Sequence, residues 1–163
     1  MKRSAVLVCA CVFVFLSVPA AAQDTSSLVE MLRTDIKSEK INILTEALAL
    51  SDSQGAAFWP LYREYDVALN KILDQRIALV REYMDSYDSM TEEAALSLGK
   101  RVLGLEDSFL KLRKSSFQKV AKQVSPTVAG RWLQVESAIQ KFLDLQVGLA
   151  MPLIEKTAES PKK

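Results

Sequence analysis

Few side chains in this sequence could carry out chemistry, and those most used in catalysis are missing. The 163 residues include no histidine, and the two cysteines, Cys9 and Cys11, lie in an apolar segment near the start. No glycine-rich phosphate loop and no Gly-x-Ser-x-Gly motif occurs. Carboxylate pairs such as Glu92 and Glu93 fall at ordinary solvated positions of an expected helix. We therefore predict that the protein is not an enzyme.

The same inventory argues against a bound metal ion or cofactor. Zinc in proteins is held mainly by cysteine and histidine, and the Cys-x-x-Cys-His motif that attaches haem is absent. A site made only of carboxylates is the one remaining way to hold a divalent ion. We predict no cofactor and no metal site.

One run of like charge lies between residues 108 and 125. It has five basic residues and no acidic one: Lys111, Arg113, Lys114, Lys119 and Lys122. Lys111, Lys114 and Lys122 are expected near one side of a helix, beside an apolar stripe that contains Phe109. Three interpretations are open. The run is a solvated face balanced by acidic residues of a neighbouring helix, a surface that attracts acidic or unfolded clients, or a surface that binds membrane headgroups. Lys111, Lys114, Lys122 and Phe109 are the candidate client-binding residues.

The first 22 residues have the pattern of a cleaved signal peptide. A basic start that includes Lys2 and Arg3 is followed by an apolar run over residues 5–18 and by small residues ending at Ala22. The alternative is an uncleaved membrane anchor, but the run is shorter than the ~20 residues that span a bilayer. We predict cleavage after Ala22 and export to the periplasm.

The expected mature chain, residues 23–163, forms one domain without cysteine. Removal of Lys2 and Arg3 from the 21 basic residues leaves 19 against 20 acidic residues, so nothing in the charge points to nucleic acid. After Val18 no apolar segment is long enough to cross a bilayer, so we expect no stable membrane insertion once the signal is removed.

The mature sequence has helical periodicity throughout and predicts an all-α fold. Helices are expected over about 26–48, 51–86, 92–123 and 126–151, with a polar patch at 37–40 where the first could bend or break. Ser51, Thr91 and Ser125 are the expected N-caps. We predict four long antiparallel amphipathic helices in an elongated, hairpin-like bundle over residues 23–154, and a disordered polar tail over 155–163.

The last two expected helices carry rows of mostly apolar residues with a seven-residue rhythm. The third carries Leu98, Val102, Leu105, Phe109, Leu112, Ser116 and Val120, and the fourth carries Val128, Trp132, Val135, Ile139, Phe142, Gln146 and Leu149. Rods of this length have a high ratio of surface to volume. We therefore expect part of the apolar stripe to face a client or the partner in a homodimer.

The start of the second helix also resembles a known motif. Leu50, Ser51 and Gln54 fit the Leu-Thr-x-x-Gln helix start of the Spy/CpxP family of periplasmic proteins, with serine in place of threonine. The best candidate for that family's second copy of the motif, residues 124–128, lacks the glutamine. Segments 58–69, 87–93 and 130–136 resemble a subgroup of exported proteins within the family.

The resemblance implies an exported, ATP-independent chaperone or stress-responsive adaptor that binds unfolded or partner proteins on a helical surface. The alternative is a structural or scaffold bundle without a client surface. An uncovered apolar patch in the isolated protein would favour the first hypothesis, and full burial of all four stripes would favour the second.

Overall fold

A computed structural model describes residues 39–154, and these residues are helical or in short connections. The elements are a helix over 39–48, α2 (Asp52–Ser86), the short 3₁₀ helix η1 (Tyr87–Ser89), α3 (Glu92–Gln123) and α4 (Pro126–Ala150). The predictions of an all-α fold and of antiparallel helices are confirmed. The expected signal peptide, the first part of the first helix and the polar tail lie outside the described residues.

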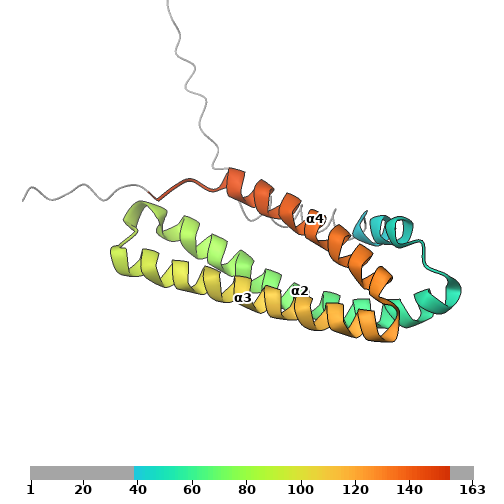
Figure 1. Ribbon diagram of the computed structural model, residues 1–163. Coiled ribbons are helices and arrows are strands. Elements are labelled where there is room, and N and C mark those ends of the chain that lie inside the picture. The colour runs from blue at the N-terminus through green and yellow to red at the C-terminus, as the bar shows by residue number, and fades with distance from the viewer. Residues whose placement is uncertain (1–38, 155–163) are drawn as a thin grey trace, which may run out of the picture.

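Helices α2 and α3 form a long hairpin, and α4 doubles back along it. Figure 1 shows α2 and α3 side by side, with η1 at the turn between them and α4 running away from their other end. The helix over 39–48 lies near the first half of α4. Four helices thus share one end of the molecule, while α4 alone accompanies the hairpin toward its turn.

Serine or threonine caps begin all three long helices where the sequence predicts them. The Ser51 hydroxyl accepts the Gln54 backbone N–H at 3.3 Å, and the Gln54 side chain accepts the Ser51 N–H at 3.2 Å. Thr91 and Ser125 each accept an N–H three residues on, at 3.1 Å. Such caps stabilise a helix by about 1 kcal/mol each, and they fix where every rod begins.

The main core is aromatic and lies where α2, α3, α4 and the helix over 39–48 meet. Its buried members, which we call the aromatic core, are Leu44, Leu48, Phe58, Tyr62, Tyr65, Leu69, Val120, Val128, Ala129 and Trp132. The rings of Tyr65 and Trp132 meet edge to face with 5.0 Å between their centroids. A second, smaller cluster of Leu79, Tyr83 and Leu98 lies nearer the hairpin turn.

The buried row of α4 differs from the predicted one. It follows Val128, Trp132, Glu136 and Gln140 at spacings of four, whereas the predicted residue Phe142 is 53% exposed and Leu149 is 76% exposed. The seven-residue pattern did not identify this row because two of its members, Glu136 and Gln140, are polar. A row defined by apolar residues alone continues onto a neighbouring face of the helix.

The polar patch at 37–40 needs a similar correction for Lys40. The side chain of Lys40 is buried and pairs with Glu136 of α4 at 2.8 Å. The chain is helical from residue 39 to 48, so no break follows Lys40. A lysine that looks like a solvated interruption therefore belongs to the contact between two helices.

Candidate functional site

A groove opens between the α2–α3 hairpin and the second half of α4. Its volume is about 560 Å³, which is within the usual range for ligand sites. Most of its lining is apolar and includes Ile72, Leu73, Leu79, Val80 and Tyr83 of α2, Leu98, Val102, Leu105 and Phe109 of α3, Val147 of α4, and Met151 just after it. We call this cavity the groove.

The groove exists because α4 stands away from α2. No Cα atom of α4 lies within 8 Å of a Cα atom of α2, whereas α4 and α3 do approach that closely. In the first half of α4, Trp132 fills the resulting space by reaching Tyr65. In the second half, α4 presents Gln140, Asp144 and Val147 to the groove, and none of these side chains is as large as tryptophan.

Apolar side chains remain exposed at this half of the molecule. Val102, which lines the groove, is 44% exposed, and Leu145 of α4 is 59% exposed. Single exposed apolar residues are common on protein surfaces, but an apolar groove with an exposed rim is typical of a binding site.

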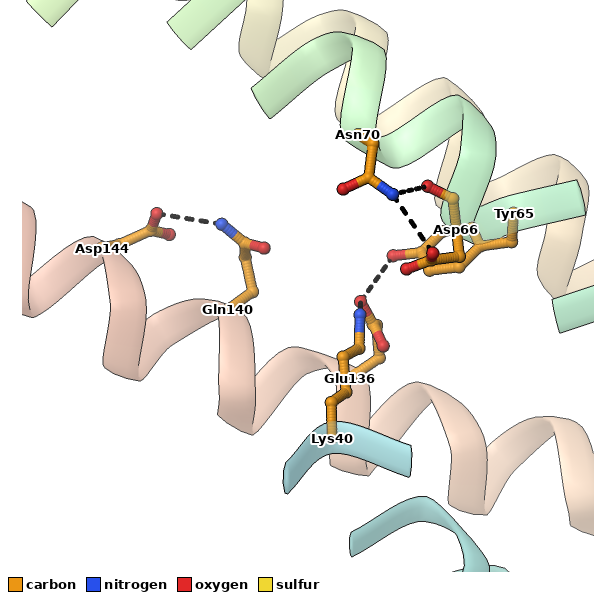
Figure 2. A network of polar contacts seen from close by, with 7 residues as sticks. All are labelled: Lys40, Tyr65, Asp66, Asn70, Glu136, Gln140 and Asp144. Atoms are coloured by element: carbon orange, nitrogen blue, oxygen red, sulfur yellow. Dashed lines mark hydrogen bonds and ion pairs between the residues drawn. The ribbon is translucent and has the colours of Figure 1, made fainter. Parts of the chain in front are cut away.

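Polar contacts connect the two walls of the groove. Arg76 of α2 forms an ion pair with Asp144 of α4, and Gln140 donates a hydrogen bond to the same carboxylate at 3.1 Å. Figure 2 shows Gln140 and Asp144 one turn apart on α4. The Arg76 and Asp144 side chains are 36% and 47% exposed, so the pair contributes less than about 1 kcal/mol and does not lock the walls together.

Two tyrosines near the hairpin turn bind the segment that follows α4, and one of them, Tyr83, lines the groove. Tyr83 donates to the backbone oxygen of Pro152 at 2.6 Å, and Tyr87 donates to that of Leu153 at 2.8 Å. Burial, and secondarily the neighbouring Tyr87, raises the pKa of Tyr83 above its usual value. The Tyr83 hydroxyl is therefore protonated, and able to donate, throughout the neutral range.

A buried polar network lies in the aromatic core, apart from the groove. Figure 2 shows Lys40 and Tyr65 converging on Glu136, and each is 2.8 Å from the same carboxylate oxygen. The Lys40 ammonium also lies 5.7 Å from the ring centres of Tyr62 and Tyr65, within cation–π range. Burial, followed by the Glu136 charge, raises the pKa of Tyr65 far above its usual value.

This network is best understood as part of the packing. Glu136 is 1% exposed, and neither Lys40, Tyr65 nor Glu136 lines the groove. A carboxylate buried this deeply requires a cationic partner and hydrogen-bond donors, and Lys40 and Tyr65 supply both. The network therefore attaches the helix over 39–48 to α2 and α4.

The structure separates the predicted client-binding residues. Lys111, Lys114 and Lys122 are all exposed, whereas Phe109 is half-buried and lines the groove. At 3.6 residues per turn the three lysines lie about 140° to 220° around α3 from Phe109. The expectation that they flank the Phe109 stripe was wrong, because they occupy the opposite face of the helix.

The basic run is only partly balanced by acidic residues of α2. Lys119 pairs with Glu64 at 2.8 Å, and both side chains are more than half exposed. Arg113 donates to Ser137 at 3.0 Å and lies 5.3 Å from the ring centre of Phe109. Within residues 39–154, Lys111, Lys114 and Lys122 form no ion pair.

The residues of the resembling motif have structural positions. Ser51 and Gln54 form the capping box of α2, and Leu50 packs against the aromatic core. None of the three lines the groove. They fix the start of α2 and thereby the register of Phe58, Tyr62 and Tyr65.

Two absences concern only the part of the chain that the structure describes. Within residues 39–154 no three histidine, cysteine or acidic side chains are grouped so that they could hold a metal ion. No helix in the same range is both long and apolar enough to cross a membrane.

The hydrogen bonds of the Tyr83 and Tyr87 hydroxyls were not predicted from the sequence. Tyr83 is buried on α2, and Tyr87 lies just beyond its end. Their hydroxyl partners follow α4, more than sixty positions away along the chain. Their spacing of four places both hydroxyls on one face of the helix end, which was the available signal.

No protein-family model, curated protein or solved structure matches this chain. The resemblance to Spy/CpxP proteins therefore rests on the motif residues and remains a prediction. The contacts and exposed surfaces of the molecule are what a functional proposal can be built on.

Proposed function

We propose that this protein is an exported, ATP-independent chaperone or stress-responsive adaptor that binds apolar segments of unfolded or partner proteins in the groove. The observation that carries this proposal is the uncovered apolar groove between the hairpin and α4. A scaffold bundle would instead bury its apolar stripes, yet Val102 is 44% exposed and Leu149 is 76% exposed.

The architecture is consistent with the resemblance to Spy/CpxP proteins. Four antiparallel helices in an elongated, hairpin-like arrangement expose a large surface area relative to the number of residues. We propose a periplasmic location on the basis of the N-terminal sequence. The homodimer expected from the sequence would cover the same exposed stripe, so clients and a second copy would compete for it.

Binding in the groove would be driven mainly by burial of apolar surface. Each square ångström of apolar surface removed from water contributes roughly 25 cal/mol, before the cost of ordering the client. The exposed lysines on the opposite face of α3 can speed the encounter with acidic clients, because steering acts over a Debye length of about 8 to 10 Å. They do not form the contact itself.

Neighbouring residues of α3 offer a matched pair of variants. Val102 lines the groove and is 44% exposed, whereas Leu103 is 62% exposed and does not line it. Val102→Asp and Leu103→Asp introduce the same charge on the same helix. Neither change should destabilise the fold by much, because both side chains already contact water.

The test is suppression of aggregation of a chemically denatured model client at equimolar protein. We expect Val102→Asp to weaken client binding by about tenfold or more, because an unpaired carboxylate would have to be desolvated in an apolar site. Leu103→Asp should behave as wild type. Equal activity of the two variants would contradict the groove as the binding site, and no activity in the wild type would contradict the proposed function.

A further inference from the structure

The end of the groove already holds a short non-helical segment of the chain itself, residues 151–154. This segment, which we call the strap, leaves α4 with extended backbone at Met151 (φ −93°, ψ 128°). Its hydrogen bonds to Tyr83 and Tyr87 are made by two consecutive backbone oxygens. Residues of the strap also line the groove.

The strap is held by its backbone and by one side chain. Leu153 is 88% exposed although its carbonyl is bonded to Tyr87, so this residue is not bound through side-chain burial. Met151 is half-buried and packs against the cluster of Leu79, Tyr83 and Leu98. Two neutral hydrogen bonds and one partly buried side chain form a weak attachment.

Backbone recognition does not depend on sequence. Every residue of a client carries a carbonyl oxygen, so two hydroxyl donors can bind two successive carbonyls of any segment that adopts the backbone conformation of the strap. The Tyr83 and Tyr87 rings lie 5.8 Å apart, and both hydroxyls bind one segment here. The neighbouring apolar wall can then accept a client side chain where Met151 packs.

We propose that Tyr83 and Tyr87 form a subsite for two successive backbone carbonyls of a non-helical apolar polypeptide, and that the strap occupies this subsite as an internal competitor until a client displaces it. This inference rests on the proposed function. It adds which residues bind the client backbone, in what conformation the client is bound, and what limits its affinity.

The effect of the strap on client affinity can be estimated from its effective concentration. A segment tethered beside its site acts at an effective concentration in the millimolar range. The apparent affinity for a client is proportional to the fraction of molecules in which the subsite is free. Loosening the strap should therefore tighten binding, and removing the two hydroxyl donors should weaken it.

The probe is a fluorescein-labelled, end-blocked peptide with the sequence of residues 149–154, Leu-Ala-Met-Pro-Leu-Ile. Its dissociation constant is measured by fluorescence anisotropy for four full-length proteins. These are wild type, Met151→Ser, Met151→Ser with Tyr83→Phe and Tyr87→Phe, and the control Tyr62→Phe. Met151→Ser removes the anchor of the strap and leaves both tyrosines in place.

We expect Met151→Ser to bind the peptide at least fivefold more tightly than wild type. Replacing both hydroxyls in that background should weaken binding by about tenfold, since each neutral hydrogen bond is worth roughly a factor of two to ten. Tyr62→Phe makes the same chemical change on α2 outside the groove, and its affinity should equal that of wild type. Melting curves of all four proteins show whether the fold is retained.

Two results would overturn the inference. Equal peptide affinity of wild type and Met151→Ser would show that the strap does not compete. Unchanged affinity after loss of both hydroxyls would show that they do not bind the client backbone. If the denatured client is still captured in either case, the proposed function stands and only the subsite fails, whereas loss of both peptide and client binding contradicts both proposals.

Discussion

The aromatic core and the groove are built by the same three long helices, yet one is filled and the other is open. In the aromatic core, Trp132 and Tyr65 occupy the space between α4 and α2. In the groove, Gln140, Asp144 and Val147 face α2 and leave about 560 Å³ unfilled. Leu44 and Leu48 of the helix over 39–48 also cover the aromatic core, so this extra helix and the larger side chains of α4 together fill one half of the hairpin and leave the other open.

The two regions also treat charge differently. The Lys40 and Glu136 pair in the aromatic core is at least nine-tenths buried, whereas Arg76 and Asp144 at the groove are substantially exposed. A buried pair makes a contact specific because either charge alone is costly, while an exposed pair is weak and easily exchanged. This contrast suggests that one half holds the fold together and the other remains free to bind.

The largest expected effect is on Trp132. Trp132→Ala would leave a cavity in the aromatic core and should lower the free energy of unfolding by about 3 to 5 kcal/mol. Phe142→Ala on the same helix removes a 53% exposed ring and should change it by less than about 1 kcal/mol. Urea denaturation of both variants checks this. Similar losses for the two would break the distinction between the halves.

Next in size is the buried pair. Lys40→Met leaves the Glu136 carboxylate buried without its cation and should destabilise the protein by about 3 kcal/mol. The double variant Lys40→Met with Glu136→Leu should recover most of that loss. Lys119→Met, which breaks the exposed pair with Glu64, serves as the control and should change stability by less than about 1 kcal/mol. A double variant no better than the single one would contradict this account of the pair.

A smaller effect follows from the buried tyrosines. Burial raises the pKa values of Tyr62 and Tyr65 in the folded state, whereas in the unfolded chain they ionise near pH 10. Their contribution is therefore complete below pH 10 and is lost as the pH rises above it, by about 1.4 kcal/mol per pH unit for each tyrosine. Tyr65→Phe should make the measured fall less steep. Parallel curves for the variant and wild type would refute the assignment.

The smallest effect concerns the connection between the helix over 39–48 and α2. Ala49 has φ of 44°, in the left-handed region that costs a residue with a Cβ about 1 to 2 kcal/mol. Ala49→Gly removes that strain but adds unfolded-state entropy, so we expect a net gain of up to about 1 kcal/mol. Ala56→Gly, at an exposed position inside α2, should instead lose about 0.5 to 1 kcal/mol. Thermal melting of both variants measures the difference.

Local signals in the sequence predicted the helices well. Ser51, Thr91 and Ser125 begin α2, α3 and α4 as expected, because capping depends on side chains within three residues. The ends at Ser86, Gln123 and Ala150 were also close to prediction, because turn residues or a nearby proline follow them. Antiparallel packing followed from the short connections.

The candidate site was harder to predict because it depends on pairs that are distant in the chain. At the groove, Arg76 and Asp144 are 68 positions apart, and Tyr83 is 69 positions from its partner Pro152. The basic run is a block of like charge, but a cluster of charges in the sequence does not show which face of α3 they occupy relative to the groove. The groove arises because the second half of α4 has no large side chain directed toward α2, and no local sequence pattern predicts such an unfilled space.

The most direct test of the division between the two regions is amide hydrogen exchange of the wild-type protein with and without a bound denatured client. We predict slower exchange over residues 98–109 of α3, the range that holds the groove-lining Leu98, Val102, Leu105 and Phe109. Exchange over 128–136 in the aromatic core and 111–122 in the basic run should stay unchanged. Client protection confined to 111–122, with none at the groove, would contradict the account.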